Sequence, residues 1–350
     1  MRVTDTVSPR STRGGEVSEK TERESYSRQK GPAFGQTRPY PEPPGVQPKK
    51  NYCAEMPWRE DNLGCSKPER KFWITMSHFS EEESNVARHY NEAFFGEELS
   101  RLPKECPVEL AVTQRWLRRV AKTGDVVAEI GVGGAHYTES IARLGCHLHL
   151  VDVSERLLDA AIEKLRRAGL EDRIAGRYHT SGAKLQGLPS ESVDLVLLMG
   201  PLYHLRSLAE RQRSVQESAR ILKRGGALFA SGINRLSYLR DLFRMDPTLV
   251  SQRVAFHQQY LRDGQLDPEH APPIGYAHMT TAAEFVTLFE GKFEKVAFLG
   301  VESFTTSWQK IFSSLPTEEA ELWLDLVEET GQTPDGLGQS DHFLFVGRKL

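Results

Sequence analysis

The chain has 350 residues, of which 39% are apolar and 27% are charged, and its formal net charge is −3. This length is enough for one large domain or two small ones. The slightly acidic balance argues against a dedicated nucleic-acid-binding protein, because such proteins usually carry an excess of Lys and Arg. No run of about 18 apolar residues occurs, so we expect no membrane-spanning helix and no membrane partner.

The first residues of the chain, from Met1 to Lys30, contain no apolar segment of the kind found in secretory signals. The four cysteines are widely spaced and form no Cys-x-x-Cys pair, so the sequence indicates neither a zinc site nor a disulfide framework. A reducing, cytoplasmic setting is therefore expected.

The N-terminal part of the chain differs in composition from the rest. Residues 1–50 contain no Leu and no Ile but hold seven of the 19 prolines, and the first Ile is Ile74. Such a stretch cannot bury enough apolar surface to offset the entropy lost on ordering. The composition predicts a disordered tail over 1–72 and one large domain over 73–350.

Helical and strand patterns alternate along that domain. Ser80 precedes three glutamates, as is typical of a helix start, and we expect helices over 81–102 and 109–120. Short apolar runs predict strands buried on both faces over 126–130, 147–153, 173–178, 193–199 and 227–232. Further helices are expected over 136–144, 155–168 and 208–222. This alternation predicts an α/β fold, an open parallel sheet with helices on both faces.

A glycine-rich turn and an acid follow the first two predicted strands. Gly131 and Gly133 follow the first strand, where glycine permits a tight turn or close approach to a ligand. Asp152 ends the second strand, 21 residues after Gly131. Ligands of open parallel sheets bind at the carboxyl ends of the strands, and an acid at this spacing can accept both hydroxyls of a ribose. The pattern predicts a nucleoside ligand.

The identity of the nucleoside follows from what the turn lacks. The dinucleotide pattern G-x-G-x-x-G requires glycine where His136 stands, and no G-x-x-x-x-G-K-[ST] segment occurs. A ligand with a ribose but no pyrophosphate fits better, because it needs no helix N-terminus for phosphate charge. S-adenosylmethionine is such a ligand.

Several segments together resemble the class I S-adenosylmethionine-dependent methyltransferases of the small-molecule type. Residues 126–135 resemble the motif acid-x-Gly-x-Gly-x-Gly, and residues 150–154 look like the acid motif of the second strand. Residues 193–200 resemble the family's fourth strand, and residues 201–205 resemble the segment that follows it. Residues 219–226 resemble the family's turn before the fifth strand. The resemblance covers about 80–350. It implies a Rossmann-like, mostly parallel seven-stranded sheet with an antiparallel edge, formed by 293–301 and 342–348.

The resemblance implies that S-adenosylmethionine is held by residues near the ends of the first four strands, namely Glu129, Gly131, Gly133, Asp152, Val153, Ala183 and Met199. Two positions depart from the family's pattern. The third motif glycine is Ala135, whose methyl group is tolerated if the backbone there is not left-handed. The acid that often ends the third strand, and accepts from the adenine amine, is missing at Ser181-Gly182-Ala183. Ser181 or main-chain groups are the candidates to replace it.

The reaction implied by the resemblance is direct displacement of the methyl group onto a small organic acceptor. An oxygen acceptor usually needs a base, and His204 with Tyr203 follows the fourth strand, close to where the methyl group is expected. The alternative is that both residues pack a loop over the cofactor. His147 and His149 alternate on a strand without a third ligand, so packing is expected there and no metal.

Three segments outside the sheet are expected to select the acceptor: the helical elements within 80–120, and the long connections 234–279 and 308–330. Their aromatic and apolar residues favour a small organic molecule over a polyanion. Two other hypotheses stay open. One is an NAD(P)-dependent oxidoreductase, disfavoured by His136, and the other is a non-catalytic interaction module on the same fold.

Overall fold

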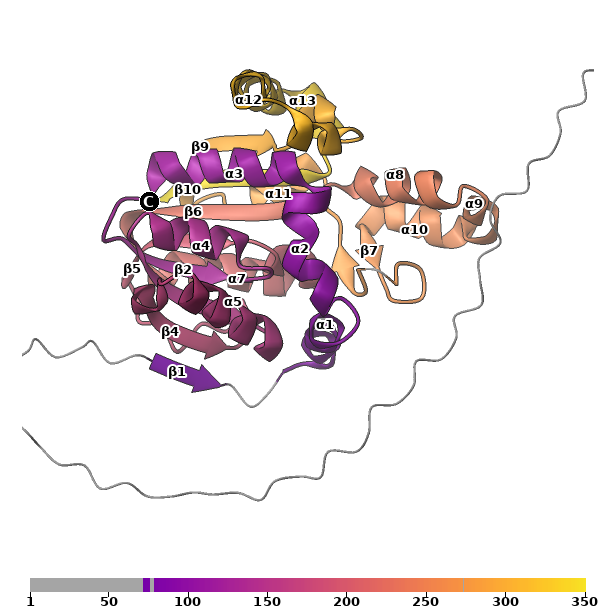
Figure 1. Ribbon diagram of the computed structural model, residues 1–350. Helices are drawn as coiled ribbons and strands as arrows, with labels where there is room; N and C mark the ends of the chain where they lie inside the picture. Colours follow the sequence, from indigo (N-terminus) through magenta and orange to yellow (C-terminus); the bar gives the residue numbers. More distant parts are fainter. Residues whose placement is uncertain (1–71, 76–78, 273) are drawn as a thin grey trace, which may run out of the picture. The chain divides into compact units, whose positions relative to one another are not determined.

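One sheet of eight strands organises the structure, a computed structural model that describes residues 72–75, 79–272 and 274–350 (Figure 1). The strands are β1 (Phe72–Thr75), β2 (Val126–Ile130), β3 (His147–Asp152), β4 (Ile174–His179), β5 (Val193–Leu198), β6 (Leu222–Ile233), β9 (Phe293–Gly300) and β10 (His342–Lys349). Their order is β1-β4-β3-β2-β5-β6-β10-β9. Apart from Phe72, the tail predicted over 1–72 lies outside the described residues.

The central strands are parallel, as the sequence predicts. β2 pairs with β3 on one side and with β5 on the other. The strand order therefore reverses between β2 and β5, and ligands of open α/β sheets bind at the carboxyl ends of the strands beside such a reversal. Val127 and Ala128 are both fully buried, in the core clusters of opposite faces, which explains the unbroken apolar pattern of this strand.

The two ends of the sheet differ. β10 is antiparallel to both β6 and β9, so the predicted antiparallel pair at this end is confirmed. At the other end β1 is an eighth strand, parallel to β4, which the sequence analysis did not predict. β1 has four residues, too few to show a periodic pattern, and its partner is about 100 residues away in the sequence.

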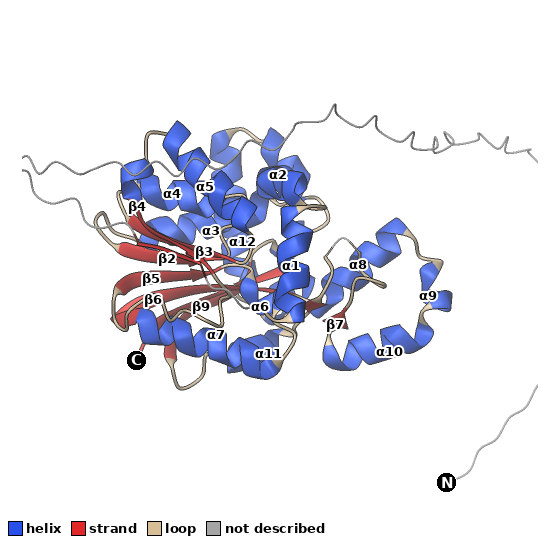
Figure 2. Ribbon diagram, turned by 90° about the horizontal axis from the view of Figure 1, so that it is seen from below, coloured by secondary structure: helices blue, strands red, loops and turns tan. Residues whose placement is uncertain are grey.

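Helices cover both faces of the sheet (Figure 2). Helices α3 (Pro107–Val120), α4 (His136–Arg143), α5 (Glu155–Arg167) and α12 (Thr317–Gly331) pack on one face, and α7 (Leu208–Ile221) and α11 (Ala282–Thr287) pack on the other. The shorter elements are α6 (Pro201–His204), α13 (Pro334–Gln339), η1 (Glu171–Arg173), η2 (Ser303–Thr305) and η3 (Gln309–Ser314). The Rossmann-like methyltransferase fold predicted from the sequence is confirmed.

The helix predicted over 81–102 is in fact two helices, α1 (Glu81–Asn91) and α2 (Phe95–Glu105). The backbone leaves the helical region at Glu92, with φ −120° and ψ −82°. A tertiary contact accompanies this break: the side chain of Asn91 accepts hydrogen bonds from the Ser154 hydroxyl and the Arg156 N–H at the start of α5. No local pattern in the sequence announces such a contact.

The connection after β6 forms a mostly helical insertion beside the sheet, seen at the right of Figures 1 and 2. It contains α8 (Arg235–Met245), α9 (Leu249–Gln252), α10 (Val254–Asp263), β7 (Gln265–Leu266) and β8 (Ala277–His278). Tyr260 and Met279 are buried in a small core of its own, against which Tyr203 packs. None of the helices among the described residues is long and apolar enough to cross a membrane.

Candidate functional site

A pocket opens at the carboxyl ends of β2, β3 and β5, where the strand order reverses. Eight residues singled out from the sequence lie in its wall: Gly131, Gly133, Asp152, Val153, Ser181, Met199, Tyr203 and His204. Helices α1 and α2 close the other side with Glu83, Val86, Tyr90 and Glu98. The pocket therefore joins segments that are more than 100 residues apart in the chain.

The glycine turn after β2 needs glycine at two positions. Gly131 has φ +86°, and a Cβ atom there would lie 2.5 Å from the carbonyl oxygen of Met199. Gly133 has φ +47°, and its Cβ would lie 2.6 Å from Oε1 of Glu98. Because a side chain at either position would meet a neighbouring atom, the two glycines let the turn approach β5 and α2 closely.

Ala135 occupies the third motif position with a left-handed backbone, φ 56° and ψ 36°. The condition under which its methyl group was expected to be tolerated is therefore not met, and this conformation costs a non-glycine residue about 1–2 kcal/mol. Two hydrogen bonds hold the turn: the Ala135 N–H donates to the Val132 oxygen at 2.8 Å, and Lys164 Nζ donates to the Ala135 oxygen at 3.0 Å.

Asp152 is held at the end of β3 by backbone groups. Its Oδ2 accepts from the Val132 N–H at 2.9 Å, and its Oδ1 accepts from the Ser154 N–H at 2.8 Å. Burial raises the pKa of this carboxyl to about 6, although the backbone hydrogen bonds act in the opposite direction. Each carboxylate oxygen keeps further acceptor capacity, so the group can still bind two hydroxyls.

Two of the residues predicted to bind the cofactor, Glu129 and Ala183, are not among the residues that line the pocket. Side chains alternate along a strand, and Glu129 is fully buried beside Thr138 of α4, whereas its neighbour Ile130 lines the pocket. Burial raises the pKa of Glu129 to about 8. Ala183 is buried and donates its N–H to the Ser181 hydroxyl at 3.2 Å.

His204 is fixed in one neutral form by its two hydrogen bonds. Nδ1 lies 3.1 Å from the carbonyl oxygen of Tyr276, which can only accept, so Nδ1 carries the proton. Nε2 therefore accepts from the hydroxyl of Tyr90, at 3.0 Å. Burial lowers the pKa of His204 to about 4. The imidazole is thus neutral at pH 7, with its unprotonated nitrogen directed at Tyr90.

The sequence analysis missed three polar residues on the helical side of this wall: Tyr90, Glu83 and Glu98. All three lie on α1 and α2, where an amphipathic pattern assigns glutamates to solvent. Glu98 is 7% exposed, and its Oε2 pairs with Arg101 Nε at 3.1 Å. No spacing rule connects these helices to the strand ends, so only the packing of the chain reveals them.

The two long connections expected to select the acceptor contribute less to this pocket than predicted. Neither 234–279 nor 308–330 supplies a lining residue. Helix α12 instead buries Leu324 in the core on the α3 face. The connection after β6 reaches the site through the Tyr276 carbonyl oxygen, which accepts from His204 Nδ1. Its residues Pro268, Pro272, Ile274, Gly275 and Tyr276 line a second pocket against α1, which shares Val86 with the first.

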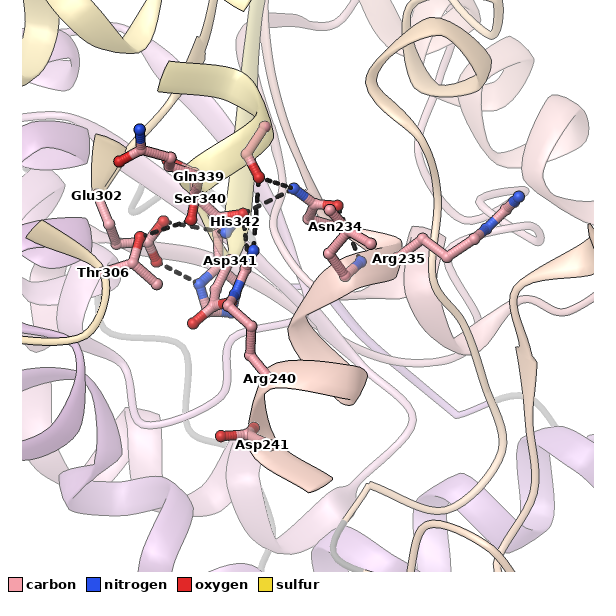
Figure 3. Close-up of polar contacts among 12 residues, drawn as sticks. Asn234, Arg235, Arg240, Asp241, Glu302, Thr306, Gln339, Ser340, Asp341 and His342 are labelled. Carbon is pink, nitrogen blue, oxygen red and sulfur yellow. Dashed lines mark hydrogen bonds and ion pairs between the residues drawn. The ribbon is translucent and has the colours of Figure 1, made fainter. Parts of the chain in front are cut away.

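A cluster of ionisable groups lies where β10 begins (Figure 3). His342 Nδ1 is 2.5 Å from Glu302 Oε1 and 3.4 Å from Glu109 Oε2. Burial alone would lower the pKa of His342, but the two glutamates outweigh it and raise the pKa to about 9. A protonated imidazole therefore balances these buried carboxylates.

The expectation of packing at His149 agrees with its contact to the Tyr178 hydroxyl, at 3.1 Å from Nδ1.

Comparison with known proteins agrees with this geometry. Residues 128–230 match the family described as "Methyltransferase domain". The ubiquinone biosynthesis O-methyltransferase of Methylococcus capsulatus is 32% identical over 170 residues, covering 45% of this chain and 69% of that protein. The Hahella chejuensis protein of the same name is 36% identical over 118 residues, covering 33% of this chain and 47% of that protein. The chain thus spans about half the length of the second relative.

Solved structures of methyltransferases are also similar. A SAM-dependent methyltransferase from Methanosarcina mazei aligns with TM-score 0.45 and 19% identity, covering 67% of this chain and 97% of that one. Geranyl diphosphate C-methyltransferase from Streptomyces coelicolor aligns with TM-score 0.47 and 13% identity, covering 77% of this chain and 99% of that one.

The chain belongs to the S-adenosylmethionine-dependent methyltransferases, of the class I fold. The residues at the pocket fit this donor: a close glycine turn, a buried carboxylate with spare acceptor sites, and apolar walls from Val153 and Met199. The family assignment therefore favours the methyltransferase over the NAD(P)-dependent oxidoreductase that the sequence analysis kept as an alternative.

Proposed function

We propose that this methyltransferase transfers the methyl group to an oxygen atom of a small organic acceptor. The observation that carries the proposal is the hydrogen bond between the Tyr90 hydroxyl and His204 Nε2, in a wall of the pocket. An oxygen acceptor must lose a proton, whereas many other acceptors need no base. The names of the two curated relatives, both O-methyltransferases, support the same choice.

Several groups in the wall of the pocket are proposed to bind the methyl donor. Asp152 accepts hydrogen bonds from the ribose hydroxyls, and Gly131 and Gly133 let the donor lie against the backbone. Val153 and Met199 give apolar contact to the base. Glu129 and Ala183 lie behind the wall, where the Ala183 N–H donates to the Ser181 hydroxyl of the loop after β4. Bound S-adenosylmethionine supplies an electrophilic methyl group on a sulfonium sulfur.

The acceptor end uses Tyr90 and His204. The Tyr90 hydroxyl donates to Nε2, and its oxygen keeps a lone pair that can accept from an acceptor hydroxyl. A proton leaving the acceptor can pass to the Tyr90 oxygen while the Tyr90 proton passes to Nε2. The hydrogen bond from Nδ1 to the Tyr276 carbonyl oxygen leaves Nε2 as the unprotonated nitrogen before the reaction. Tyr203 packs beside His204, with ring centroids 4.8 Å apart, and shapes the wall rather than moving the proton.

The remaining lining supports an apolar acceptor. Val86 and Leu205 are apolar, and Val86 also borders the second pocket. These walls suit a phenol or another aromatic alcohol. The proposal includes a cytoplasmic setting, supported by the free, buried thiols of Cys106 and Cys146, and no nucleic-acid partner.

A screen with a labelled methyl donor tests this function. The purified protein is offered matched sets of phenols, alkyl alcohols and amines, and label transferred to each is counted. We expect transfer to phenols that is lost in His204→Ala. Transfer confined to amines, and unchanged in that variant, would contradict the proposal.

A further inference from the structure

The pocket lacks an acid at the end of β4. Residues 180–182, Thr-Ser-Gly, line it there, and none of these side chains carries a charge. A carboxylate nevertheless lies in the same wall, because Glu83 of α1 is also a lining residue. This side chain is only 6% exposed.

One oxygen of Glu83 is fully engaged by the protein. Oε2 accepts from the Ser80 N–H at 2.7 Å, which completes the capping box of α1, and from Lys184 Nζ at 2.8 Å. Lys184 belongs to the loop after β4, so this ion pair fixes the start of α1 against the end of the strand. The carboxylate is thereby held at the pocket in a single orientation.

The other oxygen has no such partner. Oε1 is buried and makes no hydrogen bond among the described residues. Burial would raise the pKa of Glu83, but Lys184, Ser181 and Ser80 together lower it, so the group is ionised at neutral pH. A buried anionic oxygen without a donor is unfavourable, and a ligand in the pocket can supply the donor.

The position of Glu83 indicates which donor this is. Asp152 ends β3 and Val153 follows it, while Ser181 and Gly182 follow the neighbouring β4. A base attached to a ribose at Asp152 therefore extends past Val153 toward the wall that holds Glu83. We propose that Glu83 Oε1 accepts a hydrogen bond from the exocyclic amino group of adenine, and so selects a 6-aminopurine in the methyl donor.

The capping box alone does not account for this arrangement. The chain has a second capping box at the start of α11, where Glu284 Oε2 accepts from the Thr281 N–H at 2.9 Å and pairs with Arg235. The Glu284 side chain is 48% exposed. A capping-box glutamate therefore does not need to be buried, and Glu83 differs from Glu284 in that it is buried in the wall of a pocket.

The inference rests on the methyl donor of the proposed function and not on the acceptor. Calorimetry compares binding of S-adenosylhomocysteine with that of its analogue in which hydrogen replaces the 6-amino group. We expect the wild-type protein to bind the analogue roughly 10- to 100-fold more weakly, the loss of one hydrogen bond to a charged group. In Glu83→Gln this ratio falls about tenfold, and in Glu83→Ala it approaches one.

Glu284→Gln is the matched control, since it alters a capping-box glutamate away from the pocket and should keep the wild-type ratio. An unchanged ratio in a folded Glu83→Gln protein would show that Glu83 is only a cap and would overturn the inference, while the donor assignment stands. Failure of the wild-type protein to bind S-adenosylhomocysteine at all would overturn both.

Discussion

The carboxylate of Asp152 accepts a hydrogen bond from the backbone N–H of Val132 at 2.9 Å, and this contact joins the end of β3 to the glycine turn after β2. The two residues are 20 positions apart, which is the spacing that the ribose-binding pattern requires. The bond orients the carboxylate before any ligand binds, so less ordering remains to be done on binding.

Asp152→Ala should weaken binding of S-adenosylhomocysteine by about 10- to 100-fold, because one or two charge-assisted hydrogen bonds are lost. Isothermal titration calorimetry measures this directly. Asp194→Asn is a suitable control, because Asp194 accepts from the Val126 N–H and from Lys223 at the opposite ends of the strands. Equal affinities in wild type and a folded Asp152→Ala protein would mean that the ribose lies elsewhere.

Binding of the same ligand should depend on pH through Asp152. Burial raises the pKa of this carboxyl from 3.8 to about 6, so it is ionised above that pH and protonated below it. Only the ionised group accepts from two hydroxyls, and the affinity should fall by up to tenfold for each pH unit below about 6. Titrations between pH 5 and 8 measure the profile. The Asp152→Asn variant should give a flatter one, and a flat wild-type profile would exclude this role.

His204→Ala should lower kcat by about 100-fold or more on an oxygen acceptor, while affinity for S-adenosylhomocysteine changes by less than about threefold. Tyr90→Phe should also lower kcat, because it removes the hydroxyl that donates to Nε2. Tyr178→Phe is the matched control, since Tyr178 makes the same kind of bond to His149 away from the pocket. Loss of ligand affinity without loss of kcat would make His204 a binding residue.

Gly131→Ala should destabilise the protein by more than about 2 kcal/mol and abolish ligand binding, because the new Cβ would meet the Met199 carbonyl oxygen. The Gly124→Ala variant separates the cost of backbone strain from the cost of the steric clash at residue 131. Gly124 has a similar positive φ of +89°, but nothing lies within 4 Å of its Cβ position. We expect a cost of only about 1–2 kcal/mol there. Urea unfolding of both variants tests the difference, and equal costs would refute the collision.

The protonated His342 should stabilise the fold below about pH 6.5, and this contribution should disappear as the pH rises through about 9. The sign follows from a pKa that is higher in the folded state, about 9, than the ordinary 6.5. Between these values the free energy of unfolding should lose about 1.4 kcal/mol per pH unit from this group. Comparison of wild type with His342→Gln from pH 6 to 10 measures it. A constant difference between the two would contradict the prediction.

The strands, most of the helices and the glycine turn were predictable because each depends on residues close together in the chain. An apolar run such as 126–130 indicates a strand buried on both faces, and Gly131 marks a turn with positive φ. The spacing to Asp152 belongs to a single βαβ unit. These local features were sufficient to predict the class of fold, the cofactor and one wall of the pocket.

The opposite wall depends on contacts that no local pattern records. Tyr90 meets His204 across 114 residues, and Glu83 meets Lys184 across 101. On a helix wheel both α1 residues fit an ordinary amphipathic surface, and only the packing of α1 on the strand ends removes them from water. The left-handed backbone of Ala135 was equally hidden, since alanine seldom adopts it. Periodicity and spacing express short-range preferences, whereas burial of a polar side chain depends on which distant segment covers it.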